Sequence, residues 1–490
     1  MDITVPPHKT KIICTVGPGS RSEGVLKGML AQGMDIARLN FSHGTFDDHR
    51  RDIGILRSVA EEAGRPLSIL VDLPGPKIRV GTLAAEPLHL IKGAEVSLTT
   101  GGIPGTTSSL PVTYEGLPRS VTPGSPIYLN DGFIELRVVD VEPDRVRCVV
   151  VAGGPLLSGK GINLPGARMY VDVLTERDRK LMDFALDEGI DTFGISFVES
   201  ADDIIRAQEH ARRRGTRIRT VAKIERAEAV ENIDAILEVT DAIMIARGDL
   251  GVEIPIEDVP VVQKELIRKA NLMCRPVITA TQMLMSMVDS RRPTRAEATD
   301  VANAILDGAD GVMLSEETAI GKYPLETVAM MARIAATMER RRKGVRSLTF
   351  LRDRLKEDLR SRQITVPDTI SLNVADAAYA LQVPFILTPT ARGTTARRIS
   401  RFKPESWIIA CSEDENVCNF LNFSYGVRPV KMKTDGDRWY RDIIGKLAGA
   451  GSVKEGDRLI LTEGKFSNGE GGTDSMGVIT IQNAEIDGPR

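Results

Sequence analysis

The sequence predicts an α/β protein made of a (β/α)8 TIM barrel, a small β-barrel lid domain inserted into that barrel, and a C-terminal α/β domain. Eight short apolar segments alternate with amphipathic helical stretches between residues 9 and 323, with an interruption between residues 75 and 170. A shorter alternation begins after residue 369. Eight strand–helix units are typical of a closed barrel. A chain of 490 residues is also too long for one hydrophobic core.

The predicted barrel strands are short and rich in β-branched and other apolar residues, as expected for parallel strands that are buried on both faces. They are residues 11–16, 35–40, 68–71, 191–197, 219–225, 241–246, 276–280 and 310–314. The interruption holds short β segments between Gly and Pro turns, which indicates a small all-β domain. Those segments are residues 96–98, 126–129, 133–139 and 146–151.

A charged stretch, 338–363, follows the barrel as a connecting helix or linker. The last part of the chain is expected to contain a helix at 375–381 and strands at 385–387, 407–410 and 458–461. The predicted domains are 1–74 with 171–345 for the barrel, 75–170 for the lid and 346–490 for the C-terminal domain.

Composition excludes several functional classes. With 64 basic and 67 acidic residues the net charge is −3, which argues against a nucleic-acid partner. The arginine runs 212–214 and 340–342 are expected to be solvated surface. Five scattered cysteines suggest neither disulfides nor a zinc site, so we expect a reducing, cytoplasmic setting. No signal peptide or membrane span is recognisable, and we expect no membrane partner.

Polar side chains follow seven of the eight predicted strands, at the barrel face where ligands bind. Arg38, Asn40 and Ser42 alternate with apolar residues and should share one side. Lys223 and Glu225 should likewise share one face of the fifth strand. The other candidates at strand ends are Asp72, Ser196, Asp249, Thr281 and residues 315–318.

Glu225 and Asp249 could hold one hard divalent cation with open coordination positions, which suits Mg²⁺ and could also accept Mn²⁺. Nearby cations would favour phosphoryl transfer, because its transition state spreads negative charge over several oxygens. These cations are Arg38, Arg79, Lys223 and Lys77. Gly248 and Asp249 begin a turn whose free N–H groups could bind a carboxylate or phosphate.

Structural explanations exist for each residue taken alone. Lys223 and Glu225 could be an ordinary ion pair at the barrel end. Asp72, Asn40 and Ser42 could cap turns, and His43 could be a surface histidine. The functional interpretation depends on their convergence at one face.

Five long motifs resemble the pyruvate kinase family: ICTVGPGSRS (13–22), ARLNFSHGTFDDH (37–49), AKIERAEAVENIDAILEVTDAIMIARGDLGVEIP (222–255), ATQMLMSM (280–287) and RRPTRAEATDVANAILDGADGVMLSEETAIGKYP (291–324). The resemblance implies a glycolytic enzyme that transfers phosphoryl from phosphoenolpyruvate to ADP, giving pyruvate and ATP. It also implies a homotetramer. The insert resembles the family's mobile lid, which closes over the site and excludes water.

The resemblance also implies residue roles. Glu225 and Asp249 would ligate Mg²⁺, Lys223 would contact the phosphoryl group and stabilise the enolate, and Arg38 would contact phosphoryl oxygens. Gly248, Asp249 and Thr281 would hold the substrate carboxylate, and Thr281 with a water chain would protonate the enolate. The expected nucleotide-side residues are Arg79, Lys160, Pro18, His43 and Asn40.

Two stretches depart from the family pattern: residues 72–79 read DLPGPKIR where the family commonly has DTKGPEIR, and residues 315–317 read SEE where SGE is usual. The family's pocket for a monovalent cation would comprise Asn40, Ser42, Asp72 and the carbonyl of Leu73. Beside it Lys77 replaces the usual glutamate, which implies activity without K⁺. Glu316 stands where glycine is usual, with a structural cost that the sequence leaves open.

The C-terminal stretch 390–397 resembles the family loop that holds an effector phosphate, with Arg392 in place of a serine. Its candidate ligands are Thr390, Arg392, Gly393, Thr394 and Thr395. The effector would be a nucleotide or a sugar phosphate, and a glycine-rich stretch, 469–477, would line the same pocket. The alternative is a plain strand-to-helix turn capped by Thr394 or Thr395.

Two other functional classes remain open at this point. One is a Mg²⁺-dependent aldolase or lyase that binds phosphoenolpyruvate or pyruvate, and the other is a non-catalytic metabolite sensor. The first would not need Arg79, Lys160 or a lid. The second is disfavoured by the presence of Lys223, Glu225, Asp249 and Thr281.

Overall fold

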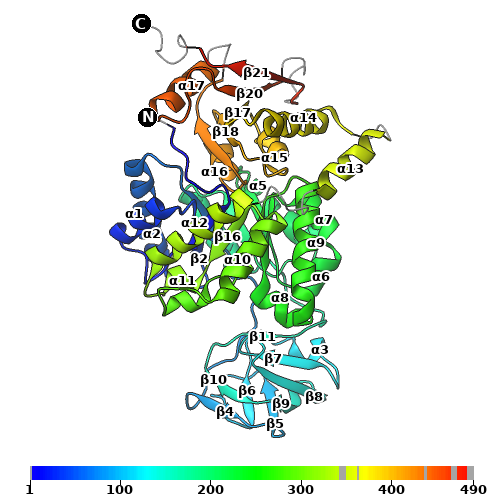
Figure 1. The fold of residues 1–490 in the computed structure, drawn as a ribbon. Helices are drawn as coiled ribbons and strands as arrows, with labels where there is room; N and C mark the ends of the chain where they lie inside the picture. The colour runs from blue at the N-terminus through cyan, green and yellow to red at the C-terminus, as the bar shows by residue number, and fades with distance from the viewer. Residues whose placement is uncertain (1–2, 342–348, 361–363, 435–438, 465–471, 483–490) are drawn as a thin grey trace.

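The computed structural model describes residues 3–341, 349–360, 364–434, 439–464 and 472–482. Its centre is a closed barrel of parallel strands in the order β1-β16-β15-β14-β13-β12-β3-β2 (Figure 1). The strands are β1 Lys11–Thr15, β2 Ile36–Asn40, β3 Ser68–Asp72, β12 Thr192–Ile195, β13 Arg219–Ile224, β14 Ala242–Ala246, β15 Val277–Ala280 and β16 Gly311–Leu314. All eight predicted barrel strands are confirmed.

Helices surround the barrel and bury their apolar faces against it. The main ones are α1 Glu23–Gln32, α2 Phe46–Ala63, α4 Glu176–Asp187, α5 Ala201–Arg213, α6 Ala227–Glu231, α7 Ile233–Val239, α9 Val259–Leu272, α10 Arg295–Asp307 and α12 Pro324–Arg341. Short helices follow the strands at the carboxyl end of the barrel: α8 Arg247–Glu253, η1 Ile256–Asp258, η2 Met285–Val288 and α11 Glu316–Ala319. Capping boxes that begin at Thr45, Thr175 and Thr294 explain the sharp starts of α2, α4 and α10.

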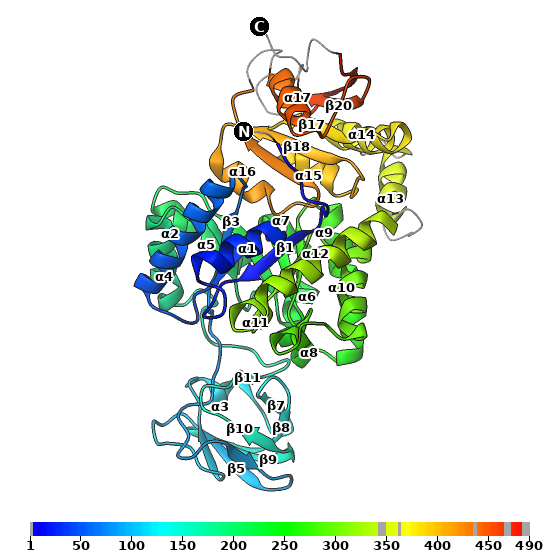
Figure 2. The same cartoon turned by 60° about the vertical axis from the view of Figure 1, so that its left-hand side comes forward.

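The insert is an all-β lid, as predicted, with a six-stranded sheet β11-β7-β8-β9-β5-β6 and a two-stranded sheet β10-β4. Its elements are β4 Leu88–Leu90, β5 Glu95–Thr99, β6 Ser109–Pro111, α3 Leu117–Ser120, β7 Pro126–Leu129, β8 Ile134–Glu142, β9 Arg145–Ala152, β10 Gly154–Leu156 and β11 Ile162–Asn163. The lid has its own apolar core, which extends from Ile78 to Ala167. Figure 2 shows the lid joined to the barrel by two chain segments only.

The C-terminal domain contains a five-stranded sheet, β19-β18-β17-β20-β21, in which only β21 runs antiparallel to its neighbour. Its strands are β17 Phe385–Pro389, β18 Trp407–Ser412, β19 Val427–Lys431, β20 Arg458–Glu463 and β21 Ser475–Thr480. Its helices are α14 Val366–Leu381, α15 Thr394–Ser400, α16 Glu415–Leu421 and α17 Trp439–Gly449, and α13 Thr349–Arg360 precedes them. The sequence pattern missed β19 and β21.

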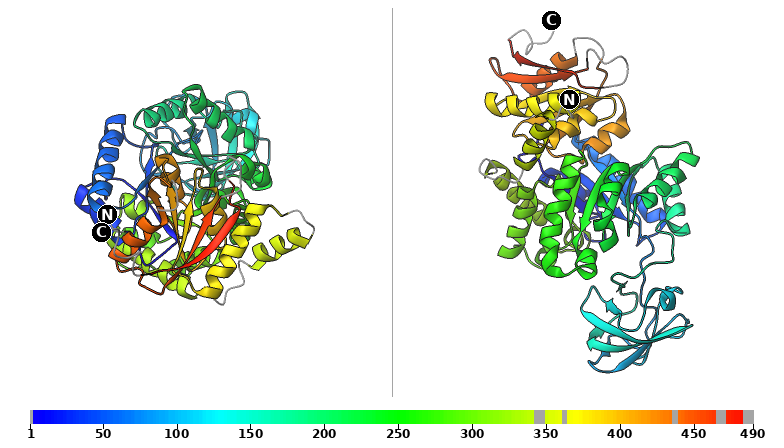
Figure 3. Two further views of the ribbon diagram at one scale, coloured as in Figure 1. Left: turned by 90° about the horizontal axis from the view of Figure 1, so that it is seen from above. Right: turned by 90° about the vertical axis from the view of Figure 1, so that its right-hand side faces the viewer.

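The lid and the C-terminal domain lie at opposite ends of the barrel (Figure 3). Phe420 and Phe423 of the C-terminal domain pack into the apolar barrel interior. At the amino ends of the strands, Lys11 Nζ donates to Val427 O at 2.8 Å and Ser68 Oγ to Asn419 O at 2.7 Å. The carboxyl ends, which carry the candidate site, therefore face the lid. In the described part of the chain, none of the helices combines the length and the apolar character needed to cross a bilayer.

Candidate active site

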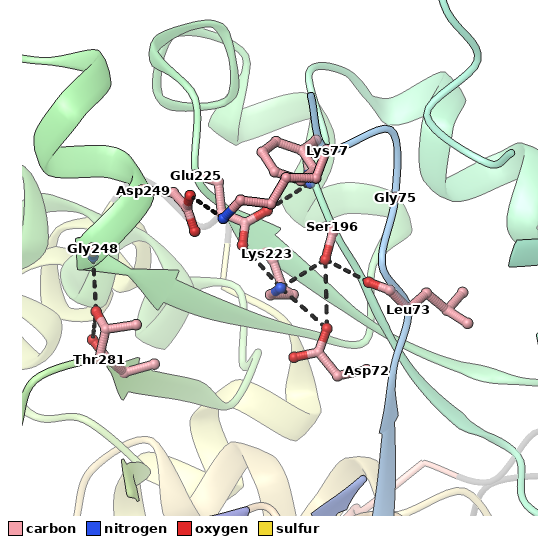
Figure 4. Close-up of polar contacts among 12 residues, drawn as sticks. Asp72, Leu73, Gly75, Lys77, Ser196, Lys223, Glu225, Gly248, Asp249 and Thr281 are labelled. Carbon is pink, nitrogen blue, oxygen red and sulfur yellow. Dashed lines mark hydrogen bonds and ion pairs between the residues drawn. The ribbon is translucent and has the colours of Figure 1, made fainter. Parts of the chain in front are cut away.

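Lys223 is the centre of a buried ionic cluster at the carboxyl end of β13 (Figure 4). Its Nζ lies 2.9 Å from Glu225 Oε1 and 3.1 Å from Asp72 Oδ1, and it donates a 2.6 Å hydrogen bond to Ser196 Oγ. The Lys223 side chain is only 11% exposed. Lys223 and Glu225 therefore lie on the same side of their strand, as alternation predicts.

Asp72 connects this cluster to the first and second strands. Arg38 Nε lies 2.7 Å from Asp72 Oδ2, and Arg38 Nη1 donates a 2.9 Å hydrogen bond to Thr15 Oγ1. One oxygen of Asp72 thus faces Arg38 while the other faces Lys223. Because a buried carboxylate is stable only when it is well paired, these contacts fix the direction of both cations.

Neighbouring charges decide the protonation of the cluster. Burial opposes the charge on Lys223, but Asp72 and Glu225 outweigh it and raise the pKa of Lys223 above its usual value. Burial also opposes ionisation of Asp72, yet Lys223 and Arg38 hold the pKa of Asp72 below its usual value. Lys223 is therefore a fixed cation at neutral pH and cannot act as a general base.

Lys77 reaches from the lid hinge to the end of the sixth barrel strand. Its Nζ lies 2.9 Å from Asp249 Oδ1 and 5.9 Å from the ring centroid of Phe197 (Figure 4). The ammonium of Lys77 thus contacts one of the two predicted Mg²⁺ ligands. The predicted cation-pocket residues have other partners: Leu73 O accepts from Ser196 Oγ at 2.7 Å, and Asn40 Oδ1 accepts from Ser42 N at 3.1 Å.

Two carboxylates at the site fit the chemistry of Mg²⁺. Glu225 and Asp249 offer oxygen ligands only. Burial raises the pKa of Glu225; the positive charge of Lys223 opposes this increase, and the negative charge of Asp249 adds to it. Among the described residues, no group of three or more His, Cys, Asp or Glu side chains forms a metal cage. A hard cation here would therefore need further oxygens from water or substrate, which is how Mg²⁺ is usually bound beside phosphates.

Thr281 and Gly248 form a unit at the ends of β14 and β15. Gly248 N donates to Thr281 Oγ1 at 2.8 Å, and Thr281 Oγ1 donates to Ala280 O at 2.6 Å. Thr281 has a φ of 69°, in the left-handed region that a β-branched residue rarely adopts. Such a conformation costs about 1–3 kcal/mol and persists only where its surroundings enforce it.

The backbone around Thr281 is held in place by the side chain of Arg247. The sequence did not indicate this role for Arg247. Arg247 Nη2 donates to Thr281 O at 2.9 Å and Nε to Ala280 O at 3.2 Å. The same guanidinium forms a fork with Asp300, at 2.6 and 2.7 Å. The arginine in the motif ARGDLG was the only available signal, and it does not identify a partner 53 residues away.

The lid hinge is anchored by another residue that was missed, Asp178. Gly75 N donates to Asp178 Oδ1 at 3.1 Å, and Gly75 has a φ of 64°. A Cβ at Gly75 would lie 3.0 Å from the side chains of Ser196 and Phe197, so the turn packs tightly on the fourth strand. Phe197, with a φ of 56°, donates its N–H to Glu225 Oε2 at 2.7 Å. Ser196 and Phe197 therefore contact both the hinge at Gly75 and the ionic cluster.

The predicted nucleotide-side residues form two groups. Arg79 and Lys160 come together at the base of the lid, where Val80 N donates to Lys160 O at 2.9 Å and Arg79 Nη1 to Gly159 O at 2.8 Å. Pro18 and His43 are exposed in the loops that follow β1 and β2, and His43 N donates to Asn40 O at 3.4 Å.

Glu316 is accommodated without strain. It is exposed at the first position of α11, and it is not among the residues with positive φ, so the usual glycine is not required by the backbone. The neighbouring Glu317 is fully buried and accepts from Ser315 N at 2.7 Å and Leu284 N at 3.0 Å. Glu317 therefore ties the loops after β15 and β16 together.

The loop resembling a phosphate site connects β17 to α15. Thr390 Oγ1 accepts from Gly393 N at 2.9 Å, and Gly393 has a φ of 76°. The start of α15 has no side-chain cap, so neither Thr394 nor Thr395 has the capping role of the alternative explanation. Thr395 Oγ1 hydrogen-bonds Thr473 Oγ1, which places the middle of the glycine-rich stretch 469–477 beside this loop. Residues 469–471 lie outside the described part.

The chain matches two family models, "Pyruvate kinase, barrel domain" over residues 7–328 and "Pyruvate kinase, alpha/beta domain" over residues 368–479. It is 49% identical over 477 residues to a pyruvate kinase of Thermococcus litoralis, covering 97% of this chain and 99% of the relative. It is 41% identical over 476 residues to a pyruvate kinase of Bacillus licheniformis, covering 96% and 80%. A crystal structure of a pyruvate kinase from Cryptosporidium parvum superimposes with a TM-score of 0.88 at 34% identity, covering 97% of this chain and 96% of that one.

Proposed function

The chain belongs to the pyruvate kinase family, and from this premise we propose that it transfers the phosphoryl group of phosphoenolpyruvate to ADP, giving pyruvate and ATP in glycolysis. The observation that carries the proposal is the ionic cluster under the lid. Lys223 Nζ contacts Asp72 and Glu225, and Arg38 contacts the other oxygen of Asp72. Phosphoryl transfer needs fixed positive charge and positioning rather than covalent catalysis, and this cluster supplies both.

Lys223 stabilises the phosphoryl group during transfer and the enolate oxygen that remains. Its raised pKa keeps the proton in place throughout. Ser196 positions the ammonium through a 2.6 Å hydrogen bond, and Arg38 directs a second cation toward the phosphoryl oxygens. These preorganised charges lower the barrier because they need no reorganisation as charge develops in the transition state.

Glu225 and Asp249 would hold Mg²⁺, which Mn²⁺ could replace, together with substrate oxygens. When bound, the ion supplies Lewis-acid charge that neutralises the substrate carboxylate and phosphoryl oxygens. Gly248, Asp249 and Thr281 hold the substrate carboxylate. A carboxylate that accepts from Gly248 N takes the place of Thr281 Oγ1, which frees the hydroxyl to join the water chain that protonates the enolate.

ADP is held on the lid side by Arg79 and Lys160, with Pro18, His43 and Asn40 on the barrel side. The close approach of Arg79 and Lys160 at the lid base supports this assignment. Closure of the lid excludes water, so that ADP rather than water accepts the phosphoryl group.

The enzyme works without K⁺. Lys77 provides a permanent cation where other family members use a monovalent ion with ligands at Asn40, Ser42, Asp72 and Leu73. Two observations support this: Arg38 and Lys223 already neutralise Asp72, and Lys77 adds its charge at Asp249.

The C-terminal domain regulates the enzyme through a phosphorylated effector, a nucleotide or a sugar phosphate. Its ligands are Thr390, Arg392, Gly393, Thr394 and Thr395. The left-handed turn at Gly393, with the hydroxyls of Thr390 and Thr395 close by, supports a phosphate site. The working enzyme is a cytoplasmic homotetramer.

One assay separates the three functional classes. The purified chain is mixed with phosphoenolpyruvate, ADP and Mg²⁺, and pyruvate and ATP are measured in parallel. Equal amounts of both support the proposal. Consumption of phosphoenolpyruvate without ATP would indicate an aldolase or lyase, and no turnover would indicate a metabolite sensor.

A further inference from the structure

A cavity of about 450 Å³ lies between the amino-terminal end of the barrel and the C-terminal domain. Its barrel wall is formed by the end of α5, the loop before β13 and Arg275. Its other wall is formed by Ala391, Arg392 and the start of α16. The cavity therefore lies on the side of the barrel away from the lid.

Arginines dominate the charge of this cavity. Five of them line it: Arg212, Arg217, Arg219, Arg275 and Arg392. Three carboxylates also line it, but each already has a partner. Asp241 pairs with Arg219 at 3.0 Å, Asp414 accepts from Asn416 N at 2.8 Å, and Asp191 accepts from Thr192 Oγ1 at 2.9 Å.

Among the described residues, Arg219 is the only one of the five arginines with an ionic partner. Arg275 is engaged with the carbonyls at the end of α7, at 2.9 Å from Leu237 O and 3.0 Å from Glu238 O. Within the described parts of the chain, Arg212, Arg217 and Arg392 form no ion pair and no side-chain hydrogen bond. Two come from the barrel and one from the C-terminal domain, so the excess positive charge spans the domain interface.

A buried guanidinium near the cavity adds to this excess: Arg397 lines a smaller pocket that shares Arg275 with the cavity. Arg397 is only 9% exposed, and its Nη1 has no hydrogen-bond partner among the described residues. Arg397 lies 5.6 Å from the ring centroid of Phe420, which Arg219 approaches at 5.3 Å. Burial lowers the pKa of Arg397 to about 10, with Asp241 opposing and Arg275 and Arg219 adding to the decrease. An unpaired buried cation is costly unless an anion lies nearby.

We propose that this interdomain cavity binds a phosphate or phosphate-ester anion, with Arg212, Arg217 and Arg392 as its ligands. Guanidinium groups match phosphate oxygens in geometry and charge. The volume is in the range of sites that bind small phosphorylated metabolites. Because the ligands belong to both domains, the bound anion stabilises their contact. The inference does not depend on the proposed reaction. It concerns a site additional to the loop 390–395, with which the cavity shares Ala391 and Arg392 and, among the proposed ligands, only Arg392.

Pyrophosphate is a suitable probe, measured by isothermal titration calorimetry on the full chain. In the double variant Arg212→Gln/Arg217→Gln, we expect the affinity of one class of pyrophosphate sites to fall at least about tenfold, because two charge-assisted contacts disappear. Both arginines are exposed at the cavity rim, so the substitutions should not disturb folding. Arg213→Gln, on the same helix but outside the cavity, is the matched control and should bind like the wild type.

Crystals soaked with tungstate locate the anion directly through anomalous scattering. The proposal predicts a peak between Arg217 and Arg392 in the wild type and its loss in the double variant. A Thr394→Val variant, which affects only the other loop, should retain this peak. Identical isotherms for the double variant and the control, or peaks confined to the lid side or to the loop 390–395, would overturn the proposal.

Discussion

Lys77 Nζ lies 2.9 Å from Asp249 Oδ1, so a residue of the lid hinge is bonded to the carboxylate that follows the sixth barrel strand. The two residues are 172 positions apart in the sequence. Lys77 thus joins the inserted domain to one of the two predicted Mg²⁺ ligands.

The first prediction concerns the charge of Lys77. Wild-type activity should be the same in buffers that contain only Na⁺ or only K⁺. Lys77→Glu reverses the charge, and we expect K⁺ to raise the turnover of this variant by about tenfold or more, a barrier change of ~1.4 kcal/mol. Steady-state kinetics in the two buffers measures the effect.

Lys92→Glu makes the same charge change at an exposed lid position and should remain independent of K⁺. Strict K⁺ activation of the wild type, or a Lys77→Glu variant indifferent to K⁺, would contradict the role given to Lys77.

Removal of the Lys223 cation should affect catalysis more than binding. We expect Lys223→Met to lower kcat by about 10²–10³-fold or more, because the ammonium acts mainly in the transition state. Mn²⁺ binding, followed by electron paramagnetic resonance, should change little. Lys180→Met, at an exposed position of α4, is the control, and a small change in kcat for Lys223→Met would assign Lys223 a purely structural role.

The substitution Arg247→Lys tests whether the contacts of Arg247 with Thr281 O and Asp300 position the Thr281 loop. Lysine cannot reproduce the fork to Asp300 while also reaching Thr281 O. We expect Arg247→Lys to lower kcat/KM for phosphoenolpyruvate by roughly ten- to a hundredfold through misplacement of the loop. Asp300→Asn should act similarly, and the double variant should be little worse than either single one. Additive losses would show that the two residues act separately.

A buried carboxyl at the lid base predicts how stability depends on pH. Glu253 lines a cavity with Pro76 and Arg226, and burial raises its pKa to about 7, with Arg226 opposing. Between its unfolded pKa, 4.5, and 7 the folded protein keeps a proton that the unfolded chain has lost. Rising pH therefore destabilises the fold across this window, and the penalty is constant above it.

Glu253→Gln removes this titration. Thermal unfolding between pH 5 and pH 8 should show the variant gaining stability relative to the wild type as the pH rises from 5 to about 7, and a constant difference from there to pH 8. The exposed Glu257→Gln should follow the wild type at every pH. Parallel curves for Glu253→Gln and the wild type would show that Glu253 ionises normally.

The barrel and the end that carries the candidate site could be predicted because the sequence patterns that mark them are local. An apolar strand followed by a polar residue can be recognised within a few positions, which is how Lys223 and Glu225 were assigned to one face. The strand β21 was missed because it is a partly exposed antiparallel strand, with a weaker apolar pattern than the buried parallel strands before it.

Side-chain partners could not be predicted because they are set by the closed fold. Asp178 binds the backbone of Gly75 across 103 positions, and Arg247 reaches Asp300 across 53. The contact between the Lys77 ammonium and Asp249 was not foreseen from the sequence either. No periodic pattern in the sequence encodes such pairings.

Phosphorus NMR of phosphoenolpyruvate, ADP and Mg²⁺ with the wild-type chain tests the central claim most directly, because it shows where the phosphoryl group goes. We expect the phosphoenolpyruvate signal to disappear as the γ-phosphate signal of ATP grows in equal measure, without added K⁺. Lys223→Met should slow this conversion by about 10²–10³-fold or more. An unchanged phosphoenolpyruvate signal, or its conversion to inorganic phosphate instead of ATP, would contradict it.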